Sequence, residues 1–356
     1  MRFLSPILQR AVYPAFARMG YFRLRASSPL RVVTYHGLLP DTYRSADHFL
    51  DVTMVRVAAF RVQLALLKKH YNVISPEHFL VWLRNQQKLP ERAVLLTCDD
   101  GLLNNLTTMA PVLQQEGLQC LFFVTGTSAG DSPEMSWYIE LYLMLKEAKR
   151  GDQPAEWRGA LIPDFPSGRQ ERVRCWLRLL RTLSRFDASA RGDFLREASH
   201  WWGLASDWRR QLLDDPLLRQ RFQLMRRPDL QQLADMGMTI GAHTMSHPIL
   251  AEQSAELARD EMAECRLALQ KCCGQPVWAV AYPFGDPASV GLREYQFAEA
   301  AGYECGFVNV GGALDASHSK FSFPRIHVTA EMSIAVYEAH ISGFHDALQR
   351  ISRRSS

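Results

Sequence analysis

The sequence predicts an α/β protein built on a mostly parallel sheet, either open or closed into a barrel. Short apolar runs rich in β-branched residues alternate with segments of helical periodicity in both halves of the chain. The links between them are short, as they are in repeated βα units. Several of these runs end in reactive residues, and the carboxyl ends of parallel strands are where such folds gather their functional groups.

The individual elements follow from periodicity and from helix-ending glycines. In the first half, strands are expected at 31–35, 93–98 and 120–126, and helices at 60–71 and roughly 104–116. In the second half, strands are expected at 237–242, 277–285 (ending in a turn), 305–310 and 323–328, and helices at 254–274 and 294–303. Gly117 and Gly274 stand where a glycine commonly ends a helix.

Residues between about 130 and 228 break this rhythm, because they carry Trp and Arg in helical segments without a strand signal. We therefore expect a helical insertion. The expected division is an amphipathic N-terminal segment at 1–29, an α/β domain at 30–129 and 228–345, the insertion at 130–227 and a basic tail at 346–356. The tryptophans of the insertion could stack on sugar rings or form its own core. We expect the core for most of Trp137, Trp157, Trp201, Trp202 and Trp208, since large aromatics are usually buried.

The composition argues against several classes of protein. The net charge of +4 is too small to favour nucleic acid and no base-reading motif is present, so no nucleic-acid partner is expected. The seven cysteines are odd in number and no two have C-x-x-C spacing. This pattern indicates reduced thiols, with neither a disulfide framework nor a zinc ribbon.

The N-terminal segment interrupts its apolar residues with arginines and prolines, so neither a signal peptide nor a membrane-spanning helix is expected. Its apolar positions have helical spacing and lie close to basic residues: Leu4, Ile7, Leu8 and Ala11 beside Arg2 and Arg10. Such a helix packs on its own domain or lies in a membrane interface. The expected location is the cytoplasm, including the inner face of the membrane.

Two histidines stand four residues apart in GAHTMSHPIL, residues 241–250. If a helical turn begins near Thr244, His243 and His247 face the same way. Both imidazoles can then reach one divalent metal at about 2.1 Å. The alternative is a capping Ser/Thr segment whose histidines are incidental.

Two aspartates, Asp99 and Asp100, follow the apolar run at 93–98. Adjacent carboxylates repel each other, and an outside charge such as a metal ion relieves the repulsion. One aspartate can ligate the metal while the other stays free as a base. Asp, His and His plus water form an open site of the catalytic type. The alternative is a simple Asp-Gly turn.

Three short segments together resemble the first three signature motifs of the polysaccharide deacetylases, the family-4 carbohydrate esterases with the NodB-homology fold. They are TCDDG at 97–101, HTMSHPIL at 243–250 and AYPFG at 281–285. The resemblance covers roughly residues 30–128 and 228–345. It implies a distorted (β/α) barrel and a hydrolase that removes an N-acetyl group, a linear amide, from an amino sugar. The substrate would be a polysaccharide or a lipid-linked glycan, as in exopolysaccharide biosynthesis.

The resemblance also implies roles for individual residues. Asp99 would be the general base, while Asp100, His243 and His247 would hold a divalent metal, usually zinc in the family and sometimes cobalt or nickel. The turn of Tyr282, Pro283 and Phe284 would supply a backbone N–H to the oxyanion and a wall to the sugar pocket.

Two positions depart from the family pattern. The third motif usually begins with an arginine that orients the base, but Ala281 stands there, and Arg325 is the expected replacement. The fifth motif usually carries the acid histidine, and no clean copy is present. His327 is the expected acid, with His36 and His340 as rivals. The alternative is that His327 merely ends a strand.

Two other functions stay open. A deformylase, or another amide or imide hydrolase acting on a lipid-linked sugar or a small molecule, would use the same metal and base. A non-catalytic glycan-binding protein would keep the fold without needing an open metal site. The expected partners are an N-acetylated glycan and, through the N-terminal helix, a peripheral membrane surface.

Overall fold

The computed structural model describes residues 8–24, 30–132, 134–312, 314 and 319–348. Its main sheet contains β1 (Leu30–Tyr35), β4 (Asn72–Ile74), β5 (Ala93–Cys98), β6 (Leu121–Val124), β9 (Thr239–Ala242), β10 (Ala279–Ala281), β11 (Cys305–Phe307) and β12 (Ile326–His327). Paired strands run parallel in the order β11-β10-β9-β6-β5-β1-β12, and β4 also pairs with β5. The predicted α/β class is confirmed.

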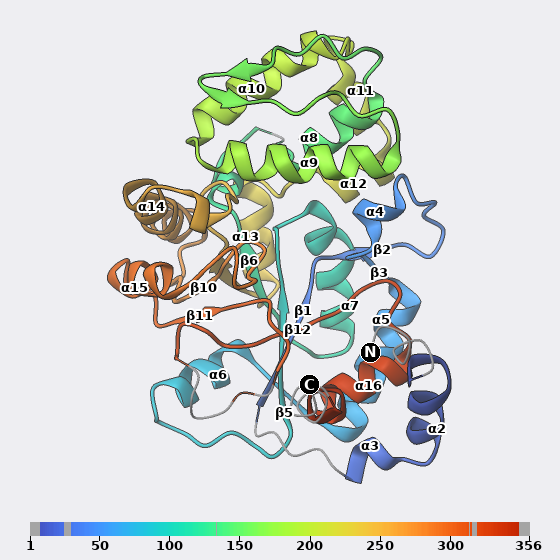
Figure 1. The fold of residues 1–356 in the computed structure, drawn as a ribbon. Helices are drawn as coiled ribbons and strands as arrows, with labels where there is room; N and C mark the ends of the chain where they lie inside the picture. Colours follow the sequence, from blue (N-terminus) through green and yellow to red (C-terminus); the bar gives the residue numbers. More distant parts are fainter. Residues whose placement is uncertain (1–7, 25–29, 133, 313, 315–318, 349–356) are drawn as a thin grey trace.

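The segment between β11 and β12 joins the two ends of this strand order. Phe323 forms a parallel bridge with Phe307 of β11, and its N–H donates to the Gly306 carbonyl at 2.9 Å. Shortly afterwards, Ile326 of β12 pairs with Val33 of β1. One stretch of chain therefore contacts both outer strands and curls the sheet into the predicted distorted barrel (Figure 1).

Strand β5 is buried on both faces, which is why its sequence is an unbroken apolar run. Val94, Leu96 and Cys98 belong to the large cluster shared with the covering helices. Leu95 belongs to a second cluster, which includes Phe79 of α6 (Pro76–Leu83). The two clusters fix the register of β5 and therefore the position of the residues that follow it.

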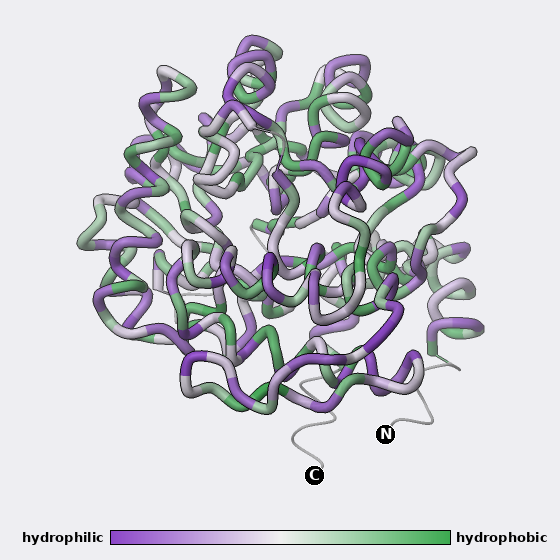
Figure 2. Tube along the Cα trace, turned by 90° about the horizontal axis from the view of Figure 1, so that it is seen from above, coloured by the Kyte–Doolittle hydropathy of each residue, from purple (hydrophilic) through white to green (hydrophobic). Residues whose placement is uncertain are grey.

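Helices cover the outside of the barrel: α5 (Val57–His70), η2 (Asn105–Met109), α7 (Ala110–Gln115), α13 (Arg227–Asp235), α14 (Ala255–Cys273), α15 (Leu292–Ala300) and α16 (Ile334–Ile341). Local signals explain the bounds of α14. The Ser254 side chain accepts from the Leu257 N–H, and Gly274 ends the helix in a left-handed conformation with φ of 66°. Figure 2 shows hydrophilic and hydrophobic stretches alternating along the peripheral helices, as expected of helices with one face on a core.

The N-terminal segment packs on its own domain. It forms η1 (Leu8–Val12), α2 (Tyr13–Arg18) and α3 (Tyr21–Leu24), and buried Tyr13 and Phe22 share an apolar cluster with α16. Leu4 and Ile7, which we placed on the same amphipathic face, lie outside the described residues. Within the described part of the chain, no helix is long and apolar enough to cross a membrane.

The insertion forms a helical layer over one end of the barrel (Figure 1). Its helices are α8 (Trp137–Glu147), α9 (Arg169–Ser184), α10 (Ala188–Trp201), α11 (Trp208–Asp214) and α12 (Pro216–Phe222). All five tryptophans considered above are buried or partly buried in one apolar cluster. A short antiparallel pair, β7 (Glu156–Trp157) and β8 (Ala160–Leu161), carries no sequence signal that we recognised.

Candidate metal centre and active site

The tip of β5 adopts a backbone that only a few residues tolerate. Asp100 and Gly101 both have φ of 75°, a left-handed value that is uncommon for a residue with a side chain. A Cβ on Gly101 would lie 2.7 Å from the Val124 side chain, so glycine is required there. The sharp turn presents the buried carboxylates of Asp99 and Asp100 at the end of the barrel.

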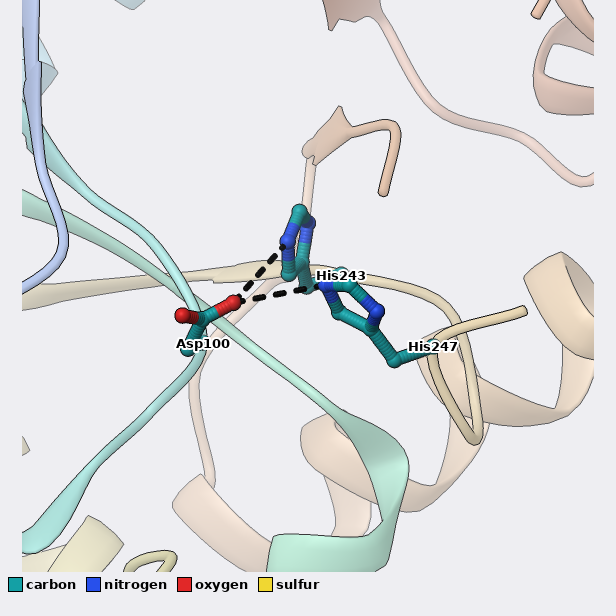
Figure 3. A group of neighbouring side chains, drawn as sticks. All are labelled: Asp100, His243 and His247. Atoms are coloured by element: carbon teal, nitrogen blue, oxygen red, sulfur yellow. Dashed lines mark ion pairs between the residues drawn. The ribbon is translucent and has the colours of Figure 1, made fainter. Parts of the chain in front are cut away.

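Asp100, His243 and His247 converge at this end of the barrel (Figure 3). The Asp100 Oδ1 lies 3.6 Å from the His243 Nε2 and 3.3 Å from the His247 Nε2. Potential ligand atoms of the three residues all lie within 4.8 Å of one another, and the residues are only 2–4% exposed. The strand ends therefore bring together the three residues that the sequence assigned to a metal.

The surroundings orient the two imidazoles. His243 follows β9, and its Nδ1 lies 2.7 Å from the Ala281 carbonyl oxygen, so a proton on Nδ1 leaves Nε2 free to ligate. His247 has φ of 58°, and its N–H donates to the Thr244 hydroxyl oxygen at 3.1 Å. Residues with a side chain rarely keep such a backbone unless their surroundings enforce it.

The three side chains fit a divalent cation. Two imidazole nitrogens and one carboxylate oxygen are a common open ligand set for zinc, and three protein ligands leave a place for water. Burial alone would raise the pKa of Asp100, but the neighbouring imidazoles of His243 and His247 hold it well below its ordinary value. Burial lowers the pKa of His247, which favours the neutral, ligating imidazole.

Asp99 faces a guanidinium instead of the histidine pair. Arg325 Nη1 and Nη2 each donate to one Asp99 oxygen at 2.6 Å, and Nη1 also donates to the Thr34 hydroxyl. Burial would raise the pKa of Asp99, but Arg325 outweighs it and brings the pKa below its ordinary value. The arginine thus holds Asp99 as an oriented carboxylate from a different strand end.

The histidine candidates separate into two groups. His36 and His327 line the same cavity as Asp99, and their ring centroids lie 4.7 Å apart. Burial lowers the pKa of His327 to about 3, so its imidazole is neutral at pH 7. His340 instead lies in α16, stacked on His345, and does not line the cavity. The structure does not bring this rival to the site.

The turn after β10 offers one backbone donor. The Tyr282 N–H already donates to the Phe307 carbonyl at 3.1 Å, and Pro283 has no N–H. The Phe284 N–H has no acceptor in the described part of the chain, and Phe284 has φ of 60°. The Phe284 ring lines the cavity and meets the His247 ring edge-on at 5.0 Å. The Tyr282 hydroxyl points elsewhere and donates to the Phe321 carbonyl.

The insertion and α4 (His48–Asp51) complete a cavity of about 310 Å³. Tyr138 of α8 stacks on His247 with ring centroids 4.5 Å apart, and Trp176 of α9 and Phe49 of α4 form further aromatic walls. Burial and then the charge of Asp100 raise the pKa of Tyr138 well above its ordinary value, so the phenol stays protonated. Sequence reasoning missed these residues, because aromatic spacing on a helix indicates burial without naming the neighbour.

The sequence is similar to that of one known protein family. The sequence model of the polysaccharide deacetylase family matches residues 86–142 and 212–305. The Bacillus subtilis (strain 168) protein YxkH, whose name describes a polysaccharide deacetylase, is 25% identical over 112 residues. The match covers 32% of this chain and 39% of that protein, so it spans well under half of the relative's length.

Several solved structures share the fold. Streptococcus pyogenes deacetylase PplD, in complex with acetate, has a TM-score of 0.54 at 17% identity, covering 88% of this chain and 97% of that one. IcaB from Ammonifex degensii gives 0.54 at 15%, covering 89% and 98%. A de-N-acetylase from Aggregatibacter actinomycetemcomitans gives 0.54 at 13%, covering 87% and 99%. At these identities the likeness shows the fold.

Proposed function

This chain belongs to the polysaccharide deacetylase family, and we propose that it is a metal-dependent hydrolase that removes an N-acetyl group from an amino sugar of a polysaccharide or lipid-linked glycan. The observation that carries the proposal is the pairing of two buried units at one end of the barrel. Asp100, His243 and His247 converge on one point, and the neighbouring Asp99 is held in a bidentate ion pair by Arg325. The first unit suits a cation and the second suits a base.

The attack of water on the acetamide would use a metal ion, a base and a backbone N–H donor. A zinc ion held by Asp100, His243 and His247 would polarise the acetamide and acidify water, and cobalt or nickel would be alternatives. Asp99, an oriented carboxylate, would take the proton of the attacking water. The free Phe284 N–H would donate to the oxyanion that forms on the acetamide carbonyl.

The leaving amine needs a proton as the C–N bond breaks. His327 is our candidate donor, and His36, its neighbour in the cavity, is the alternative. Because His327 is neutral at pH 7, it would have to receive the proton taken from water before passing it to the amine. Arg325 would keep Asp99 in place throughout.

The substrate and location extend the same proposal. The aromatic walls from Tyr138, Trp176 and Phe284 suit the apolar faces of a sugar ring. The name of the matching family, polysaccharide deacetylase, fits a polysaccharide such as an exopolysaccharide as the N-acetylated glycan. We place the activity in the cytoplasm or at the inner face of the membrane, with the membrane as a peripheral partner.

The test is acetate release from N-acetylated glycans by wild-type protein and the Asp99→Asn variant. We expect a loss of about 10²–10⁴-fold on removing the base. Asp260→Asn, on the exposed face of α14, is the matched control and should keep full activity. Metal content gives a second readout: near-stoichiometric metal in wild type should be lost in Asp100→Ala.

Other outcomes discriminate the alternatives. Formate in place of acetate would identify a deformylase. Glycan binding by metal-free protein without release of any acid would identify a binding module. Undiminished acetate release by Asp99→Asn would remove the assigned base.

A further inference from the structure

The loop that carries the metal ligand His247 is held by the insertion as well as by the barrel. Thr244 and His247 both have left-handed backbone conformations, with φ of 62° and 58°. Such a loop keeps its shape only where neighbouring groups determine it. The neighbours of residues 243–249 are therefore part of how the ligand is positioned.

Three helices of the insertion each make a hydrogen bond to this loop. The Trp137 Nε1–H of α8 donates to the His247 carbonyl oxygen at 3.2 Å. The Ser184 hydroxyl of α9 accepts from the Ile249 N–H at 3.0 Å. Arg191 of α10 donates to the Ser246 hydroxyl oxygen. These bonds surround the ligand on both sides along the chain.

Further contacts of Tyr138 and Arg191 tie these bonds together. The Tyr138 ring stacks on the His247 imidazole at 4.5 Å, so α8 contacts both the backbone and the side chain of the ligand. The Arg191 guanidinium lies 5.2 Å from the Trp137 ring and 3.4 Å from Glu261 of α14, which itself accepts from the Ser246 N–H at 2.7 Å. Arg191 is 1% exposed, so this network is shielded from water.

We propose that the insertion clamps the metal-binding loop, with Trp137, Tyr138, Ser184 and Arg191 as positioning residues that hold His247 in the geometry for ligation. The inference rests on the metal site of the proposed function and adds a role for the insertion. Because coupling between two equilibria is reciprocal, a bound metal must in turn restrain the insertion. The insertion is then an integral part of the metal centre.

The test compares two matched substitutions within the insertion. Trp137→Phe removes the donor to His247 and keeps an aromatic ring. Trp157→Phe makes the same chemical change where the indole N–H donates to Glu197 instead, away from the loop. The Zn²⁺ dissociation constant is measured for each protein by competition with a chromogenic chelator. We expect Trp137→Phe to weaken zinc binding by about 10–100-fold, as loss of an outer partner of a ligand does.

Hydrogen exchange of wild-type protein provides the second readout. Added Zn²⁺ should slow amide exchange in α8 and α10 more than in α6, which lies on a part of the barrel away from the clamp. Unaltered exchange in α8 and α10 on zinc binding would overturn the clamp even if Trp137→Phe failed to fold. Equal zinc affinity in folded Trp137→Phe and wild type would also overturn it. Wild type that binds no zinc would instead refute the proposed metal-dependent function.

Discussion

At the scale of single residues, the Asp99–Arg325 pair is the most constrained feature of the site. Arg325 is 1% exposed and Asp99 2% exposed, so both charges are largely shielded from bulk solvent. Removing one partner of a buried ion pair leaves an uncompensated charge, which typically costs about 3–5 kcal/mol. The same ion pair therefore contributes to the stability of the fold and to the orientation of the proposed base.

Arg325→Met should lower the free energy of unfolding by about 3–5 kcal/mol and reduce acetate release, because Asp99 loses its charge partner and its orientation. The double variant Ala281→Arg/Arg325→Met should recover part of both, since the family pattern places the orienting arginine at position 281. Denaturant unfolding and acetate assays check the two effects. An unchanged unfolding midpoint in Arg325→Met would contradict the importance of the pair.

Local motifs and long-range contacts differ in how far they can be predicted. Asp99, Asp100, His243 and His247 were identifiable because their chemistry is written in short segments at strand ends. Arg325 was identifiable only as a substitute for an arginine missing at Ala281. Trp137 and Tyr138 carry no local signal, since an aromatic helix such as α8 reads as core whichever surface it meets.

At the scale of elements, helix α8 carries two of the positioning residues, Trp137 and Tyr138, and it also carries a buried acid, Glu140. Glu140 is 4% exposed, and Arg209 Nε donates to it at 2.5 Å. Burial raises the pKa of Glu140 to about 7, because the lowering effect of Arg209 is smaller than the cost of burying the charge. The acid therefore keeps its proton in the folded protein over a pH range where an unfolded chain releases it.

This raised pKa predicts a pH dependence of stability. Below about pH 4.5 both folded and unfolded states are protonated at Glu140, and as pH rises to about 7 only the unfolded state releases the proton, so stability falls. The full effect is about 3 kcal/mol for this shift. Glu140→Gln cannot ionise, so its stability relative to wild type should be greater at pH 8 than at pH 5. Thermal unfolding at both pH values checks this.

The matched control is Glu147→Gln, whose side chain on the same helix is 60% exposed. It should shift the melting temperature little and equally at the two pH values. A Glu140→Gln variant whose difference from wild type is the same at pH 5 and pH 8 would contradict the raised pKa.

The long elements were predictable and the short ones were not. The predicted strand at 93–98 coincides with β5, and the predicted helix at 254–274 encloses α14, because periodicity and caps specify them locally. The pair β2 (Leu38–Leu39) and β3 (Val55–Arg56) has only two residues per strand. Such strands form only because the tertiary structure brings their backbones together, so no local stretch of sequence predicts them.

At the scale of the whole molecule, the site depends on closure of the barrel. Asp99 and Asp100 follow β5, His243 and His247 follow β9, and Arg325 precedes β12. The alternation of strands and helices predicted the sheet, but not the bridge between Phe307 and Phe323 that completes it. That contact links residues on separate segments, and nothing in either segment specifies the partner.

A metal that bridges β5 and β9 should stabilise the entire fold. The ligand set exists only when both strands are in place, so the cation binds the folded state and not the unfolded one. Free Zn²⁺ at 100 times its dissociation constant would add about 2.7 kcal/mol to the free energy of unfolding. We expect a strong chelator to lower the melting temperature of wild type by several degrees. Asp100→Ala should show no chelator effect, because it lacks one ligand and cannot gain that linkage energy. Identical melting of wild type with and without chelator would mean that no cation joins the two strand ends, and the proposed catalytic chemistry would lose its physical basis.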